Sequence, residues 1–270
     1  MENLTPKKSE KKELPEDTTC ESLVKSIESL TTEISLLKEK IKFLETTLNI
    51  NQENPQSVNN TFCQEHLNYF RGSSEKLKNQ FSFYLPYINK TKAGTSDSPI
   101  LDLGCGRGEW LELLKEKGLA ARGIDSSSAM IQELQIKGLD VIHGNLLTYL
   151  KSISDNSLGA ITGFHIVEHL SFTDLLTLMG EVSRTLKTGG IVIFETPNPS
   201  NLIVGACNFY YDPTHIRPLP SLLLKFIAEM RGLRKVEIIY LHPISTILSK
   251  ISILKHFYGP QDYAIIGYKD

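Results

Sequence analysis

The sequence lacks the features that mark several classes of protein. It has four cysteines, Cys20, Cys63, Cys105 and Cys207, and none of them forms a C-x-x-C pair. This argues against a zinc site or a disulfide framework and fits a reducing cytoplasm. No run of about 18 apolar residues is present to form a transmembrane helix. The charged N-terminus has no apolar core of a signal peptide.

The chain also lacks an excess of charge of either sign. The formal net charge is −2 over 270 residues, so we expect no nucleic-acid partner and no electrostatic attraction to an anionic membrane. The hydrophobic fraction of 40% is that of an ordinary globular protein. The length suits one large domain, or one domain with an appendage. We therefore expect a cytoplasmic globular protein.

The first 60 residues differ in texture from the rest. Residues 1–19 are rich in Lys, Glu, Pro and Thr and are predicted to be disordered. In residues 20–50 the apolar positions recur in alternating steps of four and three: Leu23, Ile27, Leu30, Ile34, Leu37, Ile41, Leu44 and Leu48. Ile mostly at heptad position a and Leu at d favours a parallel two-stranded coiled coil. The polar residues 51–60 read as a linker.

This heptad predicts a homodimer. Charges at positions g and e agree with it, since Glu33 can face a partner's Lys38, and Lys40 a partner's Glu45. The alternative is an amphipathic helix packed on its own domain. A stripe confined to a and d is narrow for that role.

Residues 61–270 form the predicted catalytic domain. A helical segment over 61–89 precedes a polar loop, and strands then alternate with helices. Strands are predicted near 99–103, 120–124, 139–143, 158–164, 190–195, 234–240 and 262–268, and helices near 108–117, 127–136, 171–187 and 221–230; residues 242–260 are expected to be helical. This alternation predicts an α/β fold: a Rossmann-like, doubly wound, mostly parallel seven-stranded sheet between layers of helices.

A glycine loop follows the first strand of this domain. Gly104-Cys105-Gly106-Arg107-Gly108 lies at the carboxyl end of that strand, where a ligand can approach the backbone closely. A dinucleotide fingerprint would need glycine where Glu109 stands, and an acid at a helix N-terminus opposes a pyrophosphate. S-adenosylmethionine (SAM), which has a zwitterionic tail and no phosphate, suits the loop better. A glycine-rich turn without a ligand is the alternative for such a loop taken alone.

Two polar residues follow the next strands. Asp125 ends the second strand, 23 residues after Asp102, and its two carboxylate oxygens can accept hydrogen bonds from both ribose hydroxyls. Asn145 follows the third strand, where its amide can pair with an adenine edge or form a simple Asx turn.

These segments together resemble the class I SAM-dependent methyltransferases. The resemblance rests on DLGCGRGEW, GID, GNL and FHIVEHL and covers about residues 61–270. It implies that the glycine loop passes under the methionine moiety, that Asp125 holds the ribose and that Met130 flanks the adenine. Asn145 stands where many members carry Asp. The expected cofactor contacts are Arg71, Asp102, Gly104, Cys105, Gly106, Gly108, Asp125, Ser126, Met130, Asn145, Leu146 and His165.

A narrower resemblance concerns the acceptor. FRGS at 70–73, ETPNP at 195–199, DPTHIRPLP at 212–220 and YGPQDYAIIG at 258–267 resemble methyltransferase domains found with bacterial surface-polysaccharide enzymes. These include O-antigen chain-terminating kinase/methyltransferases, which can also carry coiled coils. The resemblance implies a chain-terminal sugar, or a phosphate on it, as acceptor, and Arg71 as a residue closing over the cofactor carboxylate. The chain has no kinase motif.

The candidate catalytic groups follow strands four and five, at the edge where ligands bind in such sheets. His169 is the predicted general base, with Glu168 and His215 beside it. Asn198, Tyr211, His215 and Arg217 are predicted to bind the acceptor. Each has a structural alternative: a backbone-bonded histidine for His169, and a loop-ordering pair for His215 and Arg217.

A metal is a further alternative. His165, Glu168 and His169 lie within five residues, and His215 can join them. The set is similar to the E-x-x-E-H and distant His of some metal-dependent O-methyltransferases, with His165 in place of the first Glu. Such an ion would polarise an acceptor hydroxyl.

The sequence thus predicts a SAM-dependent methyltransferase that methylates a hydroxyl of a sugar, a glycan end or a phosphosugar. A small-molecule enzyme of the quinone or lipid type is the second reading, because IVEHL also resembles those enzymes. A coiled-coil scaffold that only binds SAM is the third. The intact glycine loop and Asp125 argue against it.

Overall fold

The computed structural model describes residues 25–35, 37–38, 40–41, 69–70, 72–245 and 247–270. They fall into two units, on either side of residue 60. The predicted tail over 1–19, the linker over 51–60 and Arg71 lie outside the described residues.

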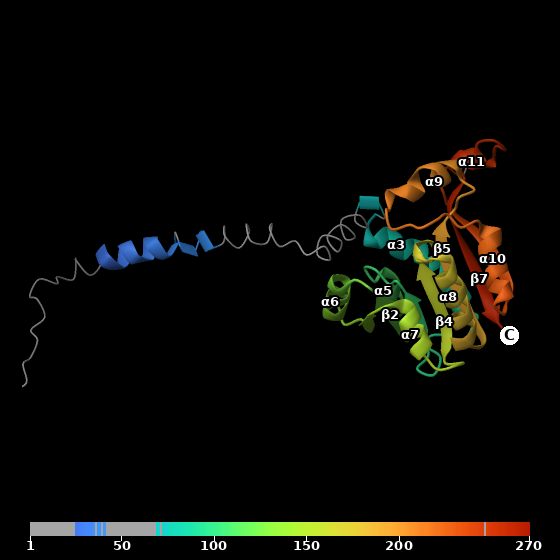
Figure 1. Ribbon diagram of the computed structural model, residues 1–270, viewed down its shortest axis with the longest axis horizontal. Helices are drawn as coiled ribbons and strands as arrows, with labels where there is room; N and C mark the ends of the chain where they lie inside the picture. Colours follow the sequence, from blue (N-terminus) through green and yellow to red (C-terminus); the bar gives the residue numbers. More distant parts are fainter. Residues whose placement is uncertain (1–24, 36, 39, 42–68, 71, 246) are drawn as a thin grey trace, which may run out of the picture. The chain divides into compact units, whose positions relative to one another are not determined.

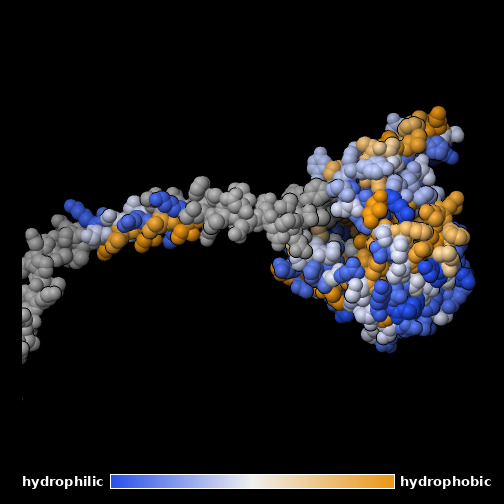
Figure 2. Space-filling model, viewed as in Figure 1, coloured by the Kyte–Doolittle hydropathy of each residue, from blue (hydrophilic) through white to orange (hydrophobic). Residues whose placement is uncertain are grey.

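The described residues between 25 and 41 are helical. Ile27, Leu30, Ile34, Leu37 and Ile41 are each 52–62% exposed. Figure 2 shows these apolar residues along one side of the helix and hydrophilic ones along the other. An apolar stripe that no other described residue covers fits the heptad, and the coiled-coil dimer stays a prediction.

The second unit is built on one seven-stranded sheet (Figure 1). Its strands are β1 (Ile100–Leu103), β2 (Ala121–Asp125), β3 (Val141–His143), β4 (Leu158–Phe164), β5 (Leu186–Pro197), β6 (Leu233–Pro243) and β7 (Pro260–Lys269). The order is β3-β2-β1-β4-β5-β7-β6, with β1 to β5 parallel and β7 antiparallel to both neighbours. The predicted Rossmann-like, mostly parallel sheet is confirmed.

Helices cover both faces of the sheet. They are α3 (Ser74–Phe81), α4 (Leu85–Asn89), α5 (Glu109–Glu116), α6 (Ser128–Ile136), α7 (Leu146–Ser152), α8 (Phe172–Thr185), α9 (Leu202–Ala206), α10 (Ser221–Met230) and α11 (Lys255–Tyr258), with short 3-10 helices η1 (Ser82–Tyr84), η2 (Val167–His169), η3 (Asn208–Tyr211) and η4 (Leu248–Lys250). One core cluster joins α3, α4 and α5 to the sheet, and another joins α7, α8 and α10 to the opposite face. Every residue of β4 is buried because it is covered on both faces.

Three predicted helical stretches were wrong in detail. Of the segment over 61–89, the structure describes 69–70 and 72–89; Gly72, with a φ of +85°, is not helical, and Ser73 caps α3 through a hydrogen bond from the N–H of Lys76. The region over 242–260 contains only η4 and α11, because β6 continues to Pro243. The helix predicted over 171–187 ends at Thr185, since Leu186 pairs with Leu158 in the sheet.

Candidate functional site

The glycine loop has left-handed backbone at all three glycines, with φ of +67° at Gly104, +50° at Gly106 and +80° at Gly108. A Cβ at Gly104 would lie 2.8 Å from Cδ1 of Ile166, and one at Gly108 would lie 2.6 Å from Cδ2 of Leu134. Packing therefore requires these two glycines. A Cβ at Gly106 would meet nothing within 4 Å, so the backbone there borders open space, as the predicted cofactor loop requires.

Asp125 ties this loop to the end of β2. Its Oδ2 accepts a 2.9 Å hydrogen bond from the N–H of Gly106, and its Oδ1 accepts one of 2.8 Å from the N–H of Ser127. Each carboxylate oxygen can accept more than one bond, so both retain capacity for a ligand hydroxyl. The carboxylate is half-buried, as a group between the backbone and a ligand would be.

Asp102 lies beneath the loop, with its side chain turned into the sheet. It accepts a 2.7 Å hydrogen bond from Thr162 Oγ1, which in turn accepts one of 3.0 Å from the indole N–H of Trp110. Burial raises the pKa of Asp102 to about 7, and the nearby charges of Asp125 and Glu109 add to the effect against the Thr162 bond. In these contacts Asp102 supports the loop from below, and its predicted contact with the cofactor stays a prediction.

The segment before α3 lies against the loop from outside. Arg107 donates from Nη2 to the carbonyl of Gly72 at 3.0 Å, and its Nε lies 2.7 Å from Oε1 of Glu109. Ser74 donates to the same Glu109 oxygen at 3.1 Å. Glu109 therefore connects the glycine loop to the start of α3 through Arg107 and Ser74. The position of Glu109 in the motif did not predict this role. The predicted cofactor residue Arg71 adjoins Gly72 but lies outside the described residues.

The remaining predicted cofactor residues lie around the ends of β2 and β3. Asn145 caps α7, and its Oδ1 accepts 3.0 Å hydrogen bonds from the N–H groups of Leu147 and Thr148. Its NH₂ group is the part left for an adenine edge. Ser126 is exposed, Met130 is buried, Leu146 is half-buried against the core, and the side chain of Cys105 is buried beside β2. Their contacts with a cofactor stay predictions.

The acceptor side begins at η2, directly beside the loop, since Ile166 packs on Gly104. Thr214 Oγ1 lies 2.5 Å from Oδ1 of Asp212 and 2.9 Å from Nδ1 of His169. A hydroxyl has one proton, and the carboxylate can only accept it. Thr214 therefore donates to Asp212 and accepts from His169, which leaves Nε2 of neutral His169 with the lone pair of a base.

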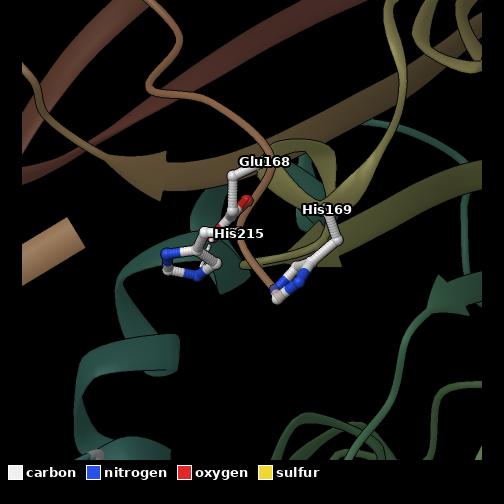
Figure 3. A group of neighbouring side chains, drawn as sticks. All are labelled: Glu168, His169 and His215. Atoms are coloured by element: carbon white, nitrogen blue, oxygen red, sulfur yellow. Dashed lines mark ion pairs between the residues drawn. The ribbon is translucent and has the colours of Figure 1, made fainter. Parts of the chain in front are cut away.

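His215 lies next to His169, with ring centroids 4.7 Å apart. Its Nδ1 donates to the carbonyl of Phe209 at 2.6 Å, so its Nε2 also carries a lone pair when the ring is neutral. Burial lowers the pKa of His215 and outweighs the nearby charge of Glu168. Figure 3 shows the side chains of Glu168 and His215 meeting beside the ring of His169.

Glu168 is fully buried, and its two oxygens differ. Oε2 accepts a 2.9 Å hydrogen bond from Thr196 Oγ1. Oε1 lies 3.3 Å from Nδ1 of His165 and 3.8 Å from Nε2 of His215, but it has no aligned hydrogen bond from any residue that the structure describes. Burial raises the pKa of this carboxyl, yet contact with His165 and the charge of His169 hold it below its usual value. A charged, buried oxygen without an aligned donor is costly, which makes Oε1 a candidate ligand atom.

A second polar cluster lies behind the first, at the ends of β5 and β6. Tyr84 donates a hydrogen bond to Oε2 of Glu195, and Nε2 of His242 lies 3.2 Å from Oε1. Burial opposes ionisation of Glu195, but His165 and His242 hold its pKa well below the usual range. Burial acts to lower the pKa of His242, but the hydrogen bond to Glu195 and the charge of that carboxylate outweigh burial, so the net pKa is raised. Sequence reasoning missed this cluster, because 111 residues separate Tyr84 from Glu195.

His165 connects the two clusters. Its φ is +57°, and its Nε2 lies 3.7 Å from both Glu195 Oε1 and Asp262 Oδ1, while Nδ1 faces Glu168. A left-handed non-glycine residue is strained, and such strain gathers at functional sites. The structure surrounds His165 with the carboxylates of Glu168, Glu195 and Asp262. Its contact with the cofactor stays a prediction.

Two predicted acceptor residues have partners of their own. Asn198 is buried, donates from Nδ2 to the carbonyl of Pro260 at 2.9 Å and accepts from the N–H of Ser200 at 3.1 Å. The amide of Asn198 therefore fixes the backbone at Ser200 and Pro260. Tyr211 is exposed and stacks on Phe70, with centroids 5.2 Å apart, so loop 207–217 meets the segment that covers the glycine loop.

Among the described residues, two sets of side chains have the chemistry and spacing for a cation. Glu168, His169 and His215 form one set, and His165, Glu195 and Asp262 form the other; within each set the potential ligand atoms lie within 4.8 Å of one another. The first set combines two imidazoles with the carboxylate oxygen that lacks an aligned donor, a donor set typical of transition metals.

Comparison with known proteins agrees with this geometry. A family model described as a methyltransferase domain matches residues 74–238. The chain is 29% identical over 133 residues to a ubiquinone biosynthesis O-methyltransferase of Alkalilimnicola ehrlichii, covering 47% of this chain and 53% of that protein. It is 28% identical over 178 residues to one of Proteus mirabilis, covering 58% and 70%. The chain thus spans about half the length of the first of these curated relatives.

Solved structures show the same fold. A SAM-dependent methyltransferase from Archaeoglobus fulgidus superposes with a TM-score of 0.67 and 34% identity, covering 75% of this chain and 97% of that one. Phosphoethanolamine N-methyltransferase 2 of Haemonchus contortus, in complex with S-adenosyl-L-methionine, superposes with a TM-score of 0.54 and 19% identity, covering 71% and 52%.

Proposed function

Because the chain belongs to the methyltransferase domain family and is a SAM-dependent methyltransferase, we propose that it methylates a hydroxyl oxygen, with His169 as the general base. Its curated relatives are named as O-methyltransferases of ubiquinone biosynthesis. That favours a small-molecule acceptor over the glycan predicted from the narrower resemblance, for which no relative named above gives support.

The orientation of His169 carries this proposal. Bound SAM supplies an electrophilic methyl group on a sulfonium sulfur. An alcohol or phenol that attacks it must lose a proton. Through Thr214, Asp212 keeps the proton of neutral His169 on Nδ1, so Nε2 is the atom that takes the acceptor proton. Asp212 then stabilises the imidazolium, and its own pKa is lowered by its bonds to Thr214 and the nearby histidines despite partial burial.

The residues around the loop fit the donor. The open space at Gly106 admits a ligand against the backbone, and Asp125 has oxygens at the loop to accept ligand hydroxyl groups. Tight alignment of donor and acceptor is most of what a methyl transfer needs. Ile166 packs on Gly104 directly before η2, so the loop that would hold the cofactor adjoins the element that carries His169.

A second mechanism is a divalent cation held by Glu168, His169 and His215. The observation that favours it is the buried Oε1 of Glu168, which no described residue satisfies with an aligned hydrogen bond. Such an ion would lower the pKa of the acceptor hydroxyl in place of a base. If a strong chelator leaves the rate unchanged, the base mechanism holds; if the chelator abolishes the rate and Mg²⁺ or Zn²⁺ restores it, the ion mechanism does.

The test is formation of S-adenosylhomocysteine and of methylated product, followed by mass spectrometry. Catechols and quinols form one panel, and sugars and phosphosugars form the other. Product from the first panel supports the small-molecule reading, and product from the second supports the glycan reading. SAM binding without product in either panel would instead support the third reading, a scaffold that only binds SAM.

We also propose that the helix between 25 and 41 pairs in parallel with that of a second copy. Its stripe of five exposed large apolar residues supports this, because an isolated helix gains nothing from leaving such a stripe in water.

A further inference from the structure

Arg217 is partly buried, and two of its three guanidinium nitrogens lack a hydrogen-bond partner among the described residues. Its Nε and Nη2 are buried, and neither forms a hydrogen bond with any residue that the structure describes. Cζ lies 4.8 Å from the centroid of the Phe172 ring, so one face of the guanidinium is covered by an aromatic side chain. A guanidinium is always charged in proteins, so these two nitrogens are the groups of the site with the most to gain from an anion.

Three other arginines of the domain are paired with acids. Arg107 lies 2.7 Å from Glu109, Arg122 lies 2.9 Å from Asp140, and Arg184 lies 2.6 Å from Glu181. No carboxylate of the described residues lies within 4.0 Å of the Arg217 nitrogens. Nε and Nη2 form one edge of the guanidinium, and two parallel N–H groups on such an edge match two oxygens of a carboxylate or phosphate.

The position of Arg217 puts this edge at the acceptor side. The residue before it, Ile216, donates its N–H to the carbonyl of Glu168 at 2.9 Å. Ile216 is 57% exposed, whereas His215 and Arg217 on either side of it are turned inward. Phe172, which covers the guanidinium, begins α8 three residues after His169. Arg217 therefore lies between η2, which carries the proposed base, and the start of α8.

We propose that the methyl acceptor carries an anionic group, a carboxylate or a phosphate, and that the Nε–Nη2 edge of Arg217 binds it while the acceptor hydroxyl faces His169. This rests on the proposed function and narrows its substrate class. The ring of Phe172 keeps the guanidinium plane in place, so the anion approaches in that plane.

Two pairs of probes test this in the complex with S-adenosylhomocysteine. 3,4-Dihydroxybenzoate is compared with its neutral amide, and glucose 6-phosphate with glucose, by calorimetric titration of the full chain. We expect the anionic member of at least one pair to bind at least 10-fold more tightly than its neutral partner, and that preference to fall below 2-fold in Arg217→Gln. The pair that shows the preference tells carboxylate from phosphate.

The matched control is Arg231→Gln, an exposed arginine at the end of α10, which should keep the full preference. Arg217→Lys should keep part of it, because a lysine retains the charge but not the two-pronged edge. The proposal is overturned if neither anion is preferred by the natural chain, or if the preference survives in Arg217→Gln with an unchanged melting temperature. Because these titrations need no turnover, failure of methyl transfer overturns the proposed function without touching this result.

Discussion

The carboxylate of Asp125 and the backbone N–H of Gly106 are joined by a 2.9 Å hydrogen bond, which fastens the glycine loop to the end of β2. The acid therefore shapes the loop and keeps lone pairs that can accept hydrogen bonds from the predicted cofactor. Its loss should affect cofactor binding more than a surface acid's loss would.

We expect Asp125→Ala to raise the dissociation constant of SAM at least 10-fold, a loss of about 1.4 kcal/mol of binding free energy. Isothermal titration calorimetry measures it. Asp140→Ala is the control, since Asp140 pairs with Arg122 on the surface and should leave SAM affinity unchanged. Equal affinities for Asp125→Ala and the natural chain would remove the cofactor site from this position.

Gly106→Ala should separate binding from stability. Both Gly106 and Gly118 have positive φ, and a Cβ at either would meet nothing within 4 Å. An alanine at each should therefore cost about 1 kcal/mol of unfolding free energy, from backbone conformation alone. Only Gly106→Ala should also abolish SAM binding, because its methyl group enters the ligand's space. If Gly118→Ala weakens SAM binding as much as Gly106→Ala, that space is not the cofactor's.

Gly108→Ala should act on stability instead. A Cβ there would lie 2.6 Å from Leu134, in addition to the unfavourable φ of +80°. We expect a loss of about 2 to 4 kcal/mol in unfolding free energy, from overpacking and backbone strain together. Urea denaturation measures it, and a loss no larger than that of Gly118→Ala would contradict the packing argument.

His169→Gln should lower kcat by roughly 10²- to 10⁴-fold and leave the KM for SAM unchanged, because a general base acts on the acceptor proton and not on the donor. Thr214→Val should lower kcat by a smaller factor, since the ring nitrogens are then no longer fixed in their roles. Both effects are measured as initial rates with an acceptor that the natural chain methylates. His256→Gln, on exposed α11, is the control. Full activity in His169→Gln would rule out this base.

His215 and His242 should make opposite contributions to the pH dependence of stability. The pKa of His215 is lowered by burial, so between that pKa and about 6.5 the unfolded chain binds more protons, and stability falls as the pH falls. The pKa of His242 is raised, with Glu195 outweighing burial, so its contribution is full below about 6.5 and is lost as the pH rises through the folded value.

Melting temperatures at pH 5, 6, 7 and 8 check these signs. Relative to the natural chain, His215→Gln should lose less stability from pH 7 to pH 5, and His242→Gln should gain less over the same fall. If both variants shift the profile in the same direction, the environments assigned to these two rings are wrong.

The dimer has its own test. Leu30→Lys and Leu37→Lys place charges at d positions and should convert a dimer to a monomer in light scattering. Thr32→Lys, on the opposite side of the heptad, should leave the dimer intact. A monomeric natural chain that is unchanged when residues 1–50 are removed would end this proposal.

Local patterns determined the fold. Continuous apolar runs such as Leu158–Phe164 predict strands buried on both faces, and this is what β4 is. The glycine loop and Asp125 were identified because their chemistry depends on positions at successive strand ends, which short stretches of sequence reveal. The element boundaries near Gly72 and Pro243 were harder to predict, because the sequence does not show how far a helix or strand continues past a single glycine or proline.

The sequence by itself determined the fold class, and it predicted the cofactor loop and the base, because each is marked by residues within one strand–loop–helix unit. Only the tertiary structure decided which ring nitrogen of neutral His169 carries the lone pair, through Thr214 45 residues away, and which buried groups of the described residues lack hydrogen-bond partners. Hydrogen bonds between distant segments depend on the packing of the whole sheet. The unpaired edge of Arg217 is such a property, since no motif states that a guanidinium has been buried without an acid.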